Sequence, residues 1–113
     1  MIMKQISFKI NNHKWKIKFK PREIMLEIYK QIDKDAYDCF GLTLRQFNMI
    51  YINDGLCEEE KIKTLKHELT HCYIWEMGFY YVDFDEETIC EFVASINDFI
   101  NTIISKAGGK DYE

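Results

Sequence analysis

Two stretches near the start of the chain alternate apolar and polar residues, and this alternation limits what the segment can fold into. A period of two places the apolar side chains of a β-strand on one face and the polar ones on the other. The segment Asn11-Asn12-His13-Lys14, between the two stretches, is typical of a tight turn. We therefore predict a β-hairpin with one apolar face and one face rich in lysine. Its apolar positions are Ile6, Phe8, Ile10, Trp15, Ile17 and Phe19.

Apolar residues at helical spacing predict three helices, near 22–34, 58–77 and 85–105. The first follows Pro21, whose fixed φ suits a first helical turn. The second begins with three glutamates, which oppose the positive end of the helix dipole, and stops before Gly78. The apolar positions are Ile24, Met25, Ile28, Tyr29 and Ile32 in the first helix, Ile62, Leu65, Leu69, Cys72 and Tyr73 in the second, and Ile89, Phe92, Val93, Ile96, Ile100 and Ile103 in the third.

Two short strands are expected at 39–44 and 48–52, and Asn53-Asp54-Gly55 is a strong signal that the second one stops. A chain of 113 residues has room for one core. The predicted fold class is therefore α+β, with an N-terminal hairpin, a short antiparallel sheet and three helices. We expect a single domain over 1–107 and a flexible tail over 108–113.

The bulk properties exclude some classes of protein. No stretch approaches the roughly 20 apolar residues that span a bilayer, so a membrane protein is not expected. The segment 1–5 has no apolar core of a signal peptide. The four cysteines are widely spaced, which favours reduced, mostly buried thiols of a cytoplasmic protein over a disulfide pair. A net charge of -4 argues against nucleic acid as the main partner.

Positive charge is nevertheless concentrated at the start of the chain. Residues 1–22 contain no carboxylate, and they hold Lys4, Lys9, Lys14, Lys16, Lys18, Lys20 and Arg22. A row of lysines on a strand is most often a solvated face that prevents edge-to-edge aggregation. Attraction of an acidic protein or of nucleic acid is the alternative, and with it a role as a DNA-associated regulator.

The second predicted helix carries a group of residues with metal chemistry. His67 and His71 are four residues apart, so both rings project from one helical face and can bind one ion. Glu68 flanks that face, where a carboxylate can reach a zinc-bound water without occupying the metal. Zinc lowers the pKa of that water towards about 7, and the glutamate takes its proton during attack on a peptide carbonyl. We predict Zn²⁺ on His67 and His71 with Glu68 as the catalytic base; two solvent-facing histidines are the alternative.

A catalytic zinc needs a third protein ligand. His13 lies in the predicted turn and is expected to be exposed. The extended pattern of another subclass requires Gly at position 74 and His at position 77, where this chain has Ile74 and Met77. That subclass is excluded.

Carboxylates at the start of the third helix are the remaining candidates. We assign Glu87 as the third ligand and Glu91, four residues later on the same face, as support for a ligating histidine. Two alternatives remain open. Glu91 or Glu86 could be the ligand in place of Glu87, or all three could be solvated acids at the start of a helix.

His-Glu-x-x-His with a glutamate on a later helix resembles the gluzincin metallopeptidases. The segments 66–73 and 85–94 are similar to the small ImmA/IrrE-type proteins of phages and integrative elements, and the resemblance covers roughly residues 48–100. In those proteins the later glutamate precedes a Phe/Val-Ala pair by about two turns, which matches Glu87 before Val93-Ala94. Two departures are Thr70, where those proteins usually have Gly, and the lack of a Pro after the last helix. The resemblance implies a zincin-like domain and a cytoplasmic protein substrate such as a repressor.

In zincin-like folds the strand before the active-site helix, here 48–53, lies along the cleft and can pair with an extended substrate. Four tyrosines are candidates for an oxyanion-stabilising hydroxyl, although packing is the expected role of each one. They are Tyr51, Tyr73, Tyr80 and Tyr81.

Three functions thus compete. The first is hydrolysis of a peptide bond, and the second is zinc binding without turnover in a domain that acts through protein contacts. The third is a DNA-associated regulator, which depends only on the basic hairpin. Glu68 favours hydrolysis, because a purely structural zinc needs no general base.

Overall fold

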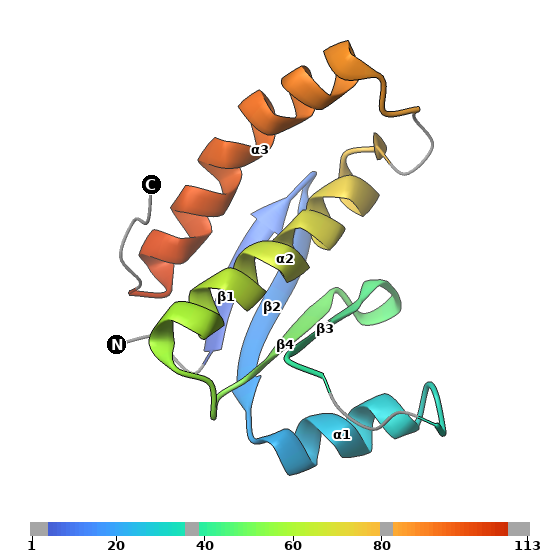
Figure 1. Cartoon of the computed structure of the whole chain (residues 1–113), viewed down its shortest axis with the longest axis vertical. Helices are drawn as coiled ribbons and strands as arrows, with labels where there is room; N and C mark the ends of the chain where they lie inside the picture. The colour runs from blue at the N-terminus through green and yellow to red at the C-terminus, as the bar shows by residue number, and fades with distance from the viewer. Residues whose placement is uncertain (1–4, 36–38, 80–82, 109–113) are drawn as a thin grey trace.

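The fold is α+β, as predicted, and a computed structural model describes residues 5–35, 39–79 and 83–108 of it (Figure 1). Within these residues it has one four-stranded sheet and three α-helices. The elements are β1 (Gln5–Ile10), β2 (His13–Lys20), α1 (Arg22–Lys30), β3 (Gly41–Leu44), a 3-10 turn η1 (Arg45–Phe47), β4 (Met49–Asn53), α2 (Glu58–Glu76) and α3 (Glu86–Lys106). Of the tail expected at 108–113, all but Gly108 lies outside the described residues.

The N-terminal hairpin is confirmed. β1 and β2 pair antiparallel, with Phe8 opposite Trp15. Asn11 and Asn12 both have positive φ, 49° and 66°, which asparagine tolerates and which a two-residue hairpin turn of type I′ requires. All six predicted apolar positions of the hairpin are buried. Local alternation was therefore sufficient to predict both the turn and the face that the core covers.

The sheet is larger than the sequence indicates. β3 and β4 pair antiparallel, as expected, but they do not form a separate sheet. β4 also pairs in parallel with β2, with Ile50 beside Ile17, so the strand order is β1-β2-β4-β3. The connection between the parallel strands contains α1 and β3, because parallel neighbours need a long crossover.

Helices α2 and α3 lie on one face of this sheet (Figure 1). The predicted stripe of α2 is confirmed, since all five of its apolar positions are buried. The helix stops before Gly78, whose φ of +81° is left-handed and favours glycine. Helix α1 is shorter than predicted and buries Met25, whereas Ile24 and Ile32 are exposed.

The predicted buried stripe of α3 is only partly correct. Ile96 and Ile103 are buried, but Ile89 and Val93 are 46% and 57% exposed. The first turns of α3 extend past the end of the sheet (Figure 1), so they have less of the sheet to pack on. Helical spacing shows which residues share a stripe, but it does not show how far the opposing layer extends. No helix in the described part of the chain has the length and apolar character to cross a membrane.

Glu76, at the end of α2, forms hydrogen bonds with residues at the turn of the hairpin. The buried Trp15 donates its indole N–H to Glu76 Oε2 at 2.6 Å, and His13 Nδ1 lies 2.7 Å from Glu76 Oε1. Asn11 donates from its side-chain amide to the Glu76 carbonyl at 3.0 Å. The His13 ring remains more than half exposed, as expected for a turn residue. These bonds hold the hairpin against the helix that carries His67 and His71.

We expect the Trp15–Glu76 hydrogen bond to stabilise the fold by about 1.5–3 kcal/mol, because its acceptor is charged and its donor is buried. Urea unfolding measures the stability of Trp15→Phe, Glu76→Ala and the double variant. Comparison of the three separates the free energy of the hydrogen bond from the loss of packing. A coupling free energy below about 0.5 kcal/mol, which is the usual error of additivity, would contradict the assignment.

Candidate metal centre

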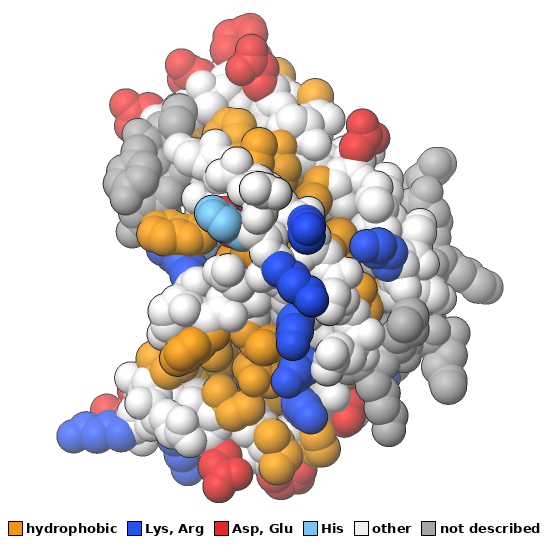
Figure 2. Space-filling model, turned by 180° about the vertical axis from the view of Figure 1, so that it is seen from behind, with side chains coloured by type: hydrophobic (Ala, Val, Ile, Leu, Met, Phe, Trp, Pro, Cys, Tyr) orange, Lys and Arg blue, Asp and Glu red, His pale blue; other side chains and the backbone are white. Residues whose placement is uncertain are grey.

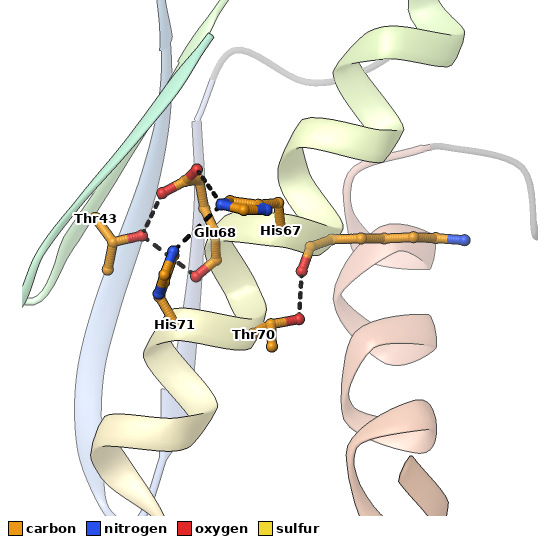
Figure 3. Close-up of polar contacts among 6 residues, drawn as sticks. Thr43, His67, Glu68, Thr70 and His71 are labelled. Atoms are coloured by element: carbon orange, nitrogen blue, oxygen red, sulfur yellow. Dashed lines mark hydrogen bonds and ion pairs between the residues drawn. The ribbon is translucent and has the colours of Figure 1, made fainter. Parts of the chain in front are cut away.

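Helix α2 presents His67 and His71 side by side on the flank that faces β3 (Figure 3). Residues four apart on a helix with 3.6 residues per turn are one turn apart on nearly the same side. Their Nε2 atoms are 3.2 Å apart, and the rings meet edge to face, with centroids 4.9 Å apart. Both side chains are exposed. The structure therefore brings the two predicted zinc ligands together on an accessible face.

The separation of the two nitrogens fits one zinc ion. Zinc–nitrogen distances of about 2.0–2.1 Å at a tetrahedral angle place two ligand nitrogens about 3.3 Å apart. The Nε2 atoms of His67 and His71 meet this condition at 3.2 Å without any change in the backbone. A hydrogen bond from one neutral ring to the other has the same length. The donor pair is thus compatible with zinc as its first two ligands.

Glu68 lies beside the histidines, but it is turned into the protein. It is buried, and its Oε1 accepts a hydrogen bond from the Thr43 hydroxyl of β3 at 2.8 Å (Figure 3). Its Oε2 is 4.0 Å from His67 Nε2. One carboxylate oxygen is therefore held by the sheet, and the other is left near the histidine pair.

The close approach of β3 to α2 depends on Gly41. A Cβ atom at this position would lie 2.7 Å from Thr64 Cγ2 and 2.8 Å from Glu68 Cγ. Real Cβ atoms do not come so close to other heavy atoms, so a larger residue would push β3 and α2 apart. The absence of a side chain at position 41 is what allows Thr43 to reach Glu68.

We expect Gly41→Ala to lower the free energy of unfolding by about 1–3 kcal/mol, the usual cost of overpacking. Urea denaturation measures the change. The matched control is Gly55→Ala, because its added Cβ would meet only the Asn53 side-chain oxygen, at 3.2 Å. Equal losses in the two variants would show that the contact with Glu68 is not tight.

A groove runs between β3 and α2 and contains the histidines. It consists of two adjoining hollows of about 410 and 300 Å³, which share Gly41, His67 and Glu68. One is completed by Phe40, Glu60, Lys63 and Thr64, and the other by Leu42, Thr43, Arg45 and His71. The exposed face of the histidine pair thus opens into this groove.

The strand beside this groove is β3 and not the strand that the sequence predicts. The expected cleft strand, 48–53, corresponds to β4, which has β2 on one side and β3 on the other. Its backbone is therefore already paired on both sides. Among the described residues, β3 is the edge of the sheet on this side. The order of strands along the chain does not show their order in a sheet, so this prediction was wrong.

The structure does not bring Glu87 or Glu91 to the histidines. Helix α3 packs on the opposite side of α2, where the Tyr73 ring lies 5.8 Å from Phe92 and 5.4 Å from Phe99. Tyr73 follows His71 by two residues, which is about 200° around the helix. The histidine side of α2 therefore faces away from α3.

Glu86, Glu87 and Glu91 are all exposed. Within the described ranges, no group of three or more His, Cys, Asp or Glu side chains is placed to hold a metal ion. The roles of Glu87 as third ligand and Glu91 as support stay predictions, and they require α3 to move relative to α2.

The tyrosines do not supply an oxyanion donor in the described part of the chain. Tyr73 packs against α3, and Tyr51 pairs beside Lys18 on the opposite face of the sheet. Tyr80 and Tyr81 lie outside the described residues. Thr70 donates its hydroxyl to the Lys66 carbonyl at 2.7 Å. Its side chain is therefore satisfied by its own helix.

The sequence did not identify the residues that β3 and η1 contribute to this groove, among them Gly41, Thr43 and Arg45. The Arg45 guanidinium lies 4.9 Å from the centre of the Trp75 ring, which is a cation–π contact one turn beyond His71. No local pattern could have found these residues, since Thr43 and Glu68 are separated by 25 positions. The one local signal of a close approach was Gly41, a glycine inside the strand predicted at 39–44.

The cysteines differ from the expectation of mostly buried thiols. Cys72 is buried, but Cys57 and Cys90 are exposed. Burial raises the pKa of the Cys72 thiol well above its usual value, and the nearby charge of Glu76 raises it further. This thiol therefore stays protonated and unreactive near neutral pH.

Comparisons with known proteins give no relative for this chain. No protein-family model matches it, and neither a curated protein nor a solved structure is similar enough to count as a match.

Proposed function

We propose that the chain is a zinc-dependent peptidase centred on residues 67–71. The observation that supports this most directly is the pair of exposed Nε2 atoms, 3.2 Å apart, beside the buried carboxylate of Glu68. Zinc on His67 and His71 would act as a Lewis acid and would lower the pKa of a water molecule towards neutrality. The resemblance to gluzincins and to ImmA/IrrE-type proteins supports the same chemistry and a zincin-like fold.

The roles of the protein groups follow from their contacts. Glu68 is the general base, and Oε2 is the oxygen that takes a proton from the attacking water and later delivers it to the leaving amine. Thr43 is a positioning residue, because its hydrogen bond to Oε1 fixes the plane of the carboxylate. Burial between β3 and α2 keeps the Glu68 side chain in that orientation.

The proposed substrate is an extended segment of a protein. The backbone of β3 at the edge of the sheet offers N–H and C=O groups to such a segment by β-augmentation. The same strand lines the groove that contains His67 and His71. A peptide paired with Leu42 would therefore run past the histidine pair. A cytoplasmic location and a repressor as the target rest on the family resemblance alone.

The third ligand is the open part of the proposal. Glu87 remains our assignment, with Glu91 as its support or its replacement, because a catalytic zinc takes three protein ligands. The second candidate function is zinc binding without turnover, with action through protein contacts. It is favoured by the observation that only two of the predicted ligands meet in the described residues.

Metal analysis and a cleavage assay test the proposal together. Protein purified without added zinc is expected to contain about one zinc ion per chain. Incubation with a library of unstructured peptides should give new termini in mass spectrometry, which a chelator removes and added zinc restores. Absence of zinc would contradict both candidate functions. Stoichiometric zinc without any cleaved bond would favour the second.

A further inference from the structure

The sheet face that α2 and α3 leave open carries a row of lysines. Alternation in β1 and β2 places Lys9, Lys14, Lys16, Lys18 and Lys20 on this face, opposite the buried apolar positions. We call these five residues the lysine face. Figure 2 looks onto this side of the molecule, where Lys and Arg side chains form a line with hydrophobic side chains next to part of it. In the described part of the chain, none of the five has an ion pair with a carboxylate.

This concentration of charge has a cost in stability. Lys9 stands directly opposite Lys14 in the antiparallel ladder, and like charges at directly opposed positions destabilise a sheet. Lys106 of α3 reaches the same edge, where its Nζ donates to the Ser7 carbonyl at 3.4 Å. Together with Phe8, these residues line a hollow of about 490 Å³. Three lysines that line one hollow are suited to bind an anion.

An aromatic ring lies next to the row. Tyr51 of β4 pairs with Lys18, and Met49 pairs with Lys16, so both project from the open face. Tyr51 is half-buried. Proteins that bind single strands combine a basic track along the backbone with aromatic rings on which bases stack. The lysine face and Tyr51 have this combination.

We propose that the lysine face and Tyr51 bind single-stranded nucleic acid, with lysines on successive phosphates and a base stacked on the Tyr51 ring. Alternate residues of a strand are roughly 7 Å apart, which is close to the step between phosphates of an extended single strand. Lysine contacts phosphate as a point charge. A single strand fits better than a duplex, because only an unpaired base can stack on the ring.

The net charge of -4 does not oppose this surface. The dense acidic patches lie in other elements, at the start of α2 and around the start of α3. The whole-chain charge led to the expectation of no nucleic acid, but charge acts locally, since salt screens it beyond about 8–10 Å. This proposal is independent of the peptidase proposal.

Fluorescence anisotropy of a labelled 15-nucleotide oligo-dT in a salt series tests the proposal. Four phosphate contacts should give a slope of log K against log salt of about -3, at roughly -0.7 per contact. Lys16→Gln with Lys18→Gln should weaken binding and make the slope shallower by about 1.4. Tyr51→Ala should weaken binding about ten-fold with an unchanged slope, and Tyr51→Phe should keep the affinity.

The matched control is Lys30→Gln with Lys34→Gln, at the end of α1 and just beyond it. This variant changes the net charge by the same amount and should alter the affinity less than two-fold. Thermal unfolding checks that each variant is folded. Failure to bind oligo-dT at low salt would overturn the proposal. Tighter binding of a polyglutamate peptide or of duplex DNA would also overturn it, in favour of an acidic protein or a duplex. An equal effect of the control variant would show that net charge and not this face is responsible.

Discussion

Glu68→Gln is expected to retain about one zinc ion per chain and to lower the rate of peptide cleavage by roughly 10²–10⁴-fold. Glutamine has the same shape, and its side-chain carbonyl can still accept the hydrogen bond that Thr43 donates at 2.8 Å. The amide cannot take a proton from water, so the base is lost while the fold stays intact. Metal analysis and initial rates on one cleaved library peptide measure the two quantities.

Two further variants show whether the effect belongs to Glu68. Glu60 lies on the same helix and lines the same groove, so Glu60→Gln removes the same charge nearby and should change the rate less than two-fold. Thr43→Val removes the hydrogen bond that positions the Glu68 carboxylate but leaves the base in place. The cleavage rate of this variant should therefore lie between those of the wild type and Glu68→Gln. Cleavage by Glu68→Gln at the wild-type rate would exclude Glu68 as the base.

His71→Ala is expected to abolish the stabilisation of the fold by zinc. A ligand that binds only the native state at 100 times its Kd raises the free energy of unfolding by about 2.7 kcal/mol. The wild type should gain this amount when zinc is added, and His71→Ala should gain almost none. His71 is exposed, so its truncation in the absence of zinc should alter stability by less than about 0.5 kcal/mol. Urea unfolding with zinc and with chelator measures both values.

The same measurement identifies the third ligand. If Glu87 binds the ion, Glu87→Ala should lose most of the increase in the free energy of unfolding that zinc causes. If Glu91 is the ligand instead, Glu91→Ala should lose it. His13→Ala is the control, because His13 contacts Glu76 at the end of α2 and not the histidine pair. Its loss should leave the stabilisation by zinc unchanged. A full gain in His71→Ala would mean that the histidine pair is not the metal site.

The parts of the fold that follow a local period were predictable from the sequence. The hairpin followed from alternation around Asn11 and Asn12, and α2 followed from its apolar stripe and from Gly78. Both depend on interactions between residues close in the chain, which a periodic pattern records directly. The relative position of His67 and His71 was predictable for the same reason, because the pitch of a helix determines it.

Other features depend on contacts between distant segments. The parallel pairing of β2 with β4 makes β3 the edge strand, and no hairpin signal encodes such a pairing. The exposure of Ile89 and Val93 depends on where the sheet stops beneath α3. Neither the edge position of β3 nor the exposure of these two residues can be predicted from the local sequence, because each depends on how whole elements are placed relative to one another.

The sequence by itself determined an α+β chain whose second helix presents two histidines and a glutamate at the spacing from which we predicted a zinc site. Only the tertiary structure decided what surrounds them. It placed Thr43 against Glu68, made β3 the wall of the groove, and set α3 on the far side of α2. The physical reason is that a helix orients its own side chains through local geometry, whereas its neighbours are chosen by packing across the core.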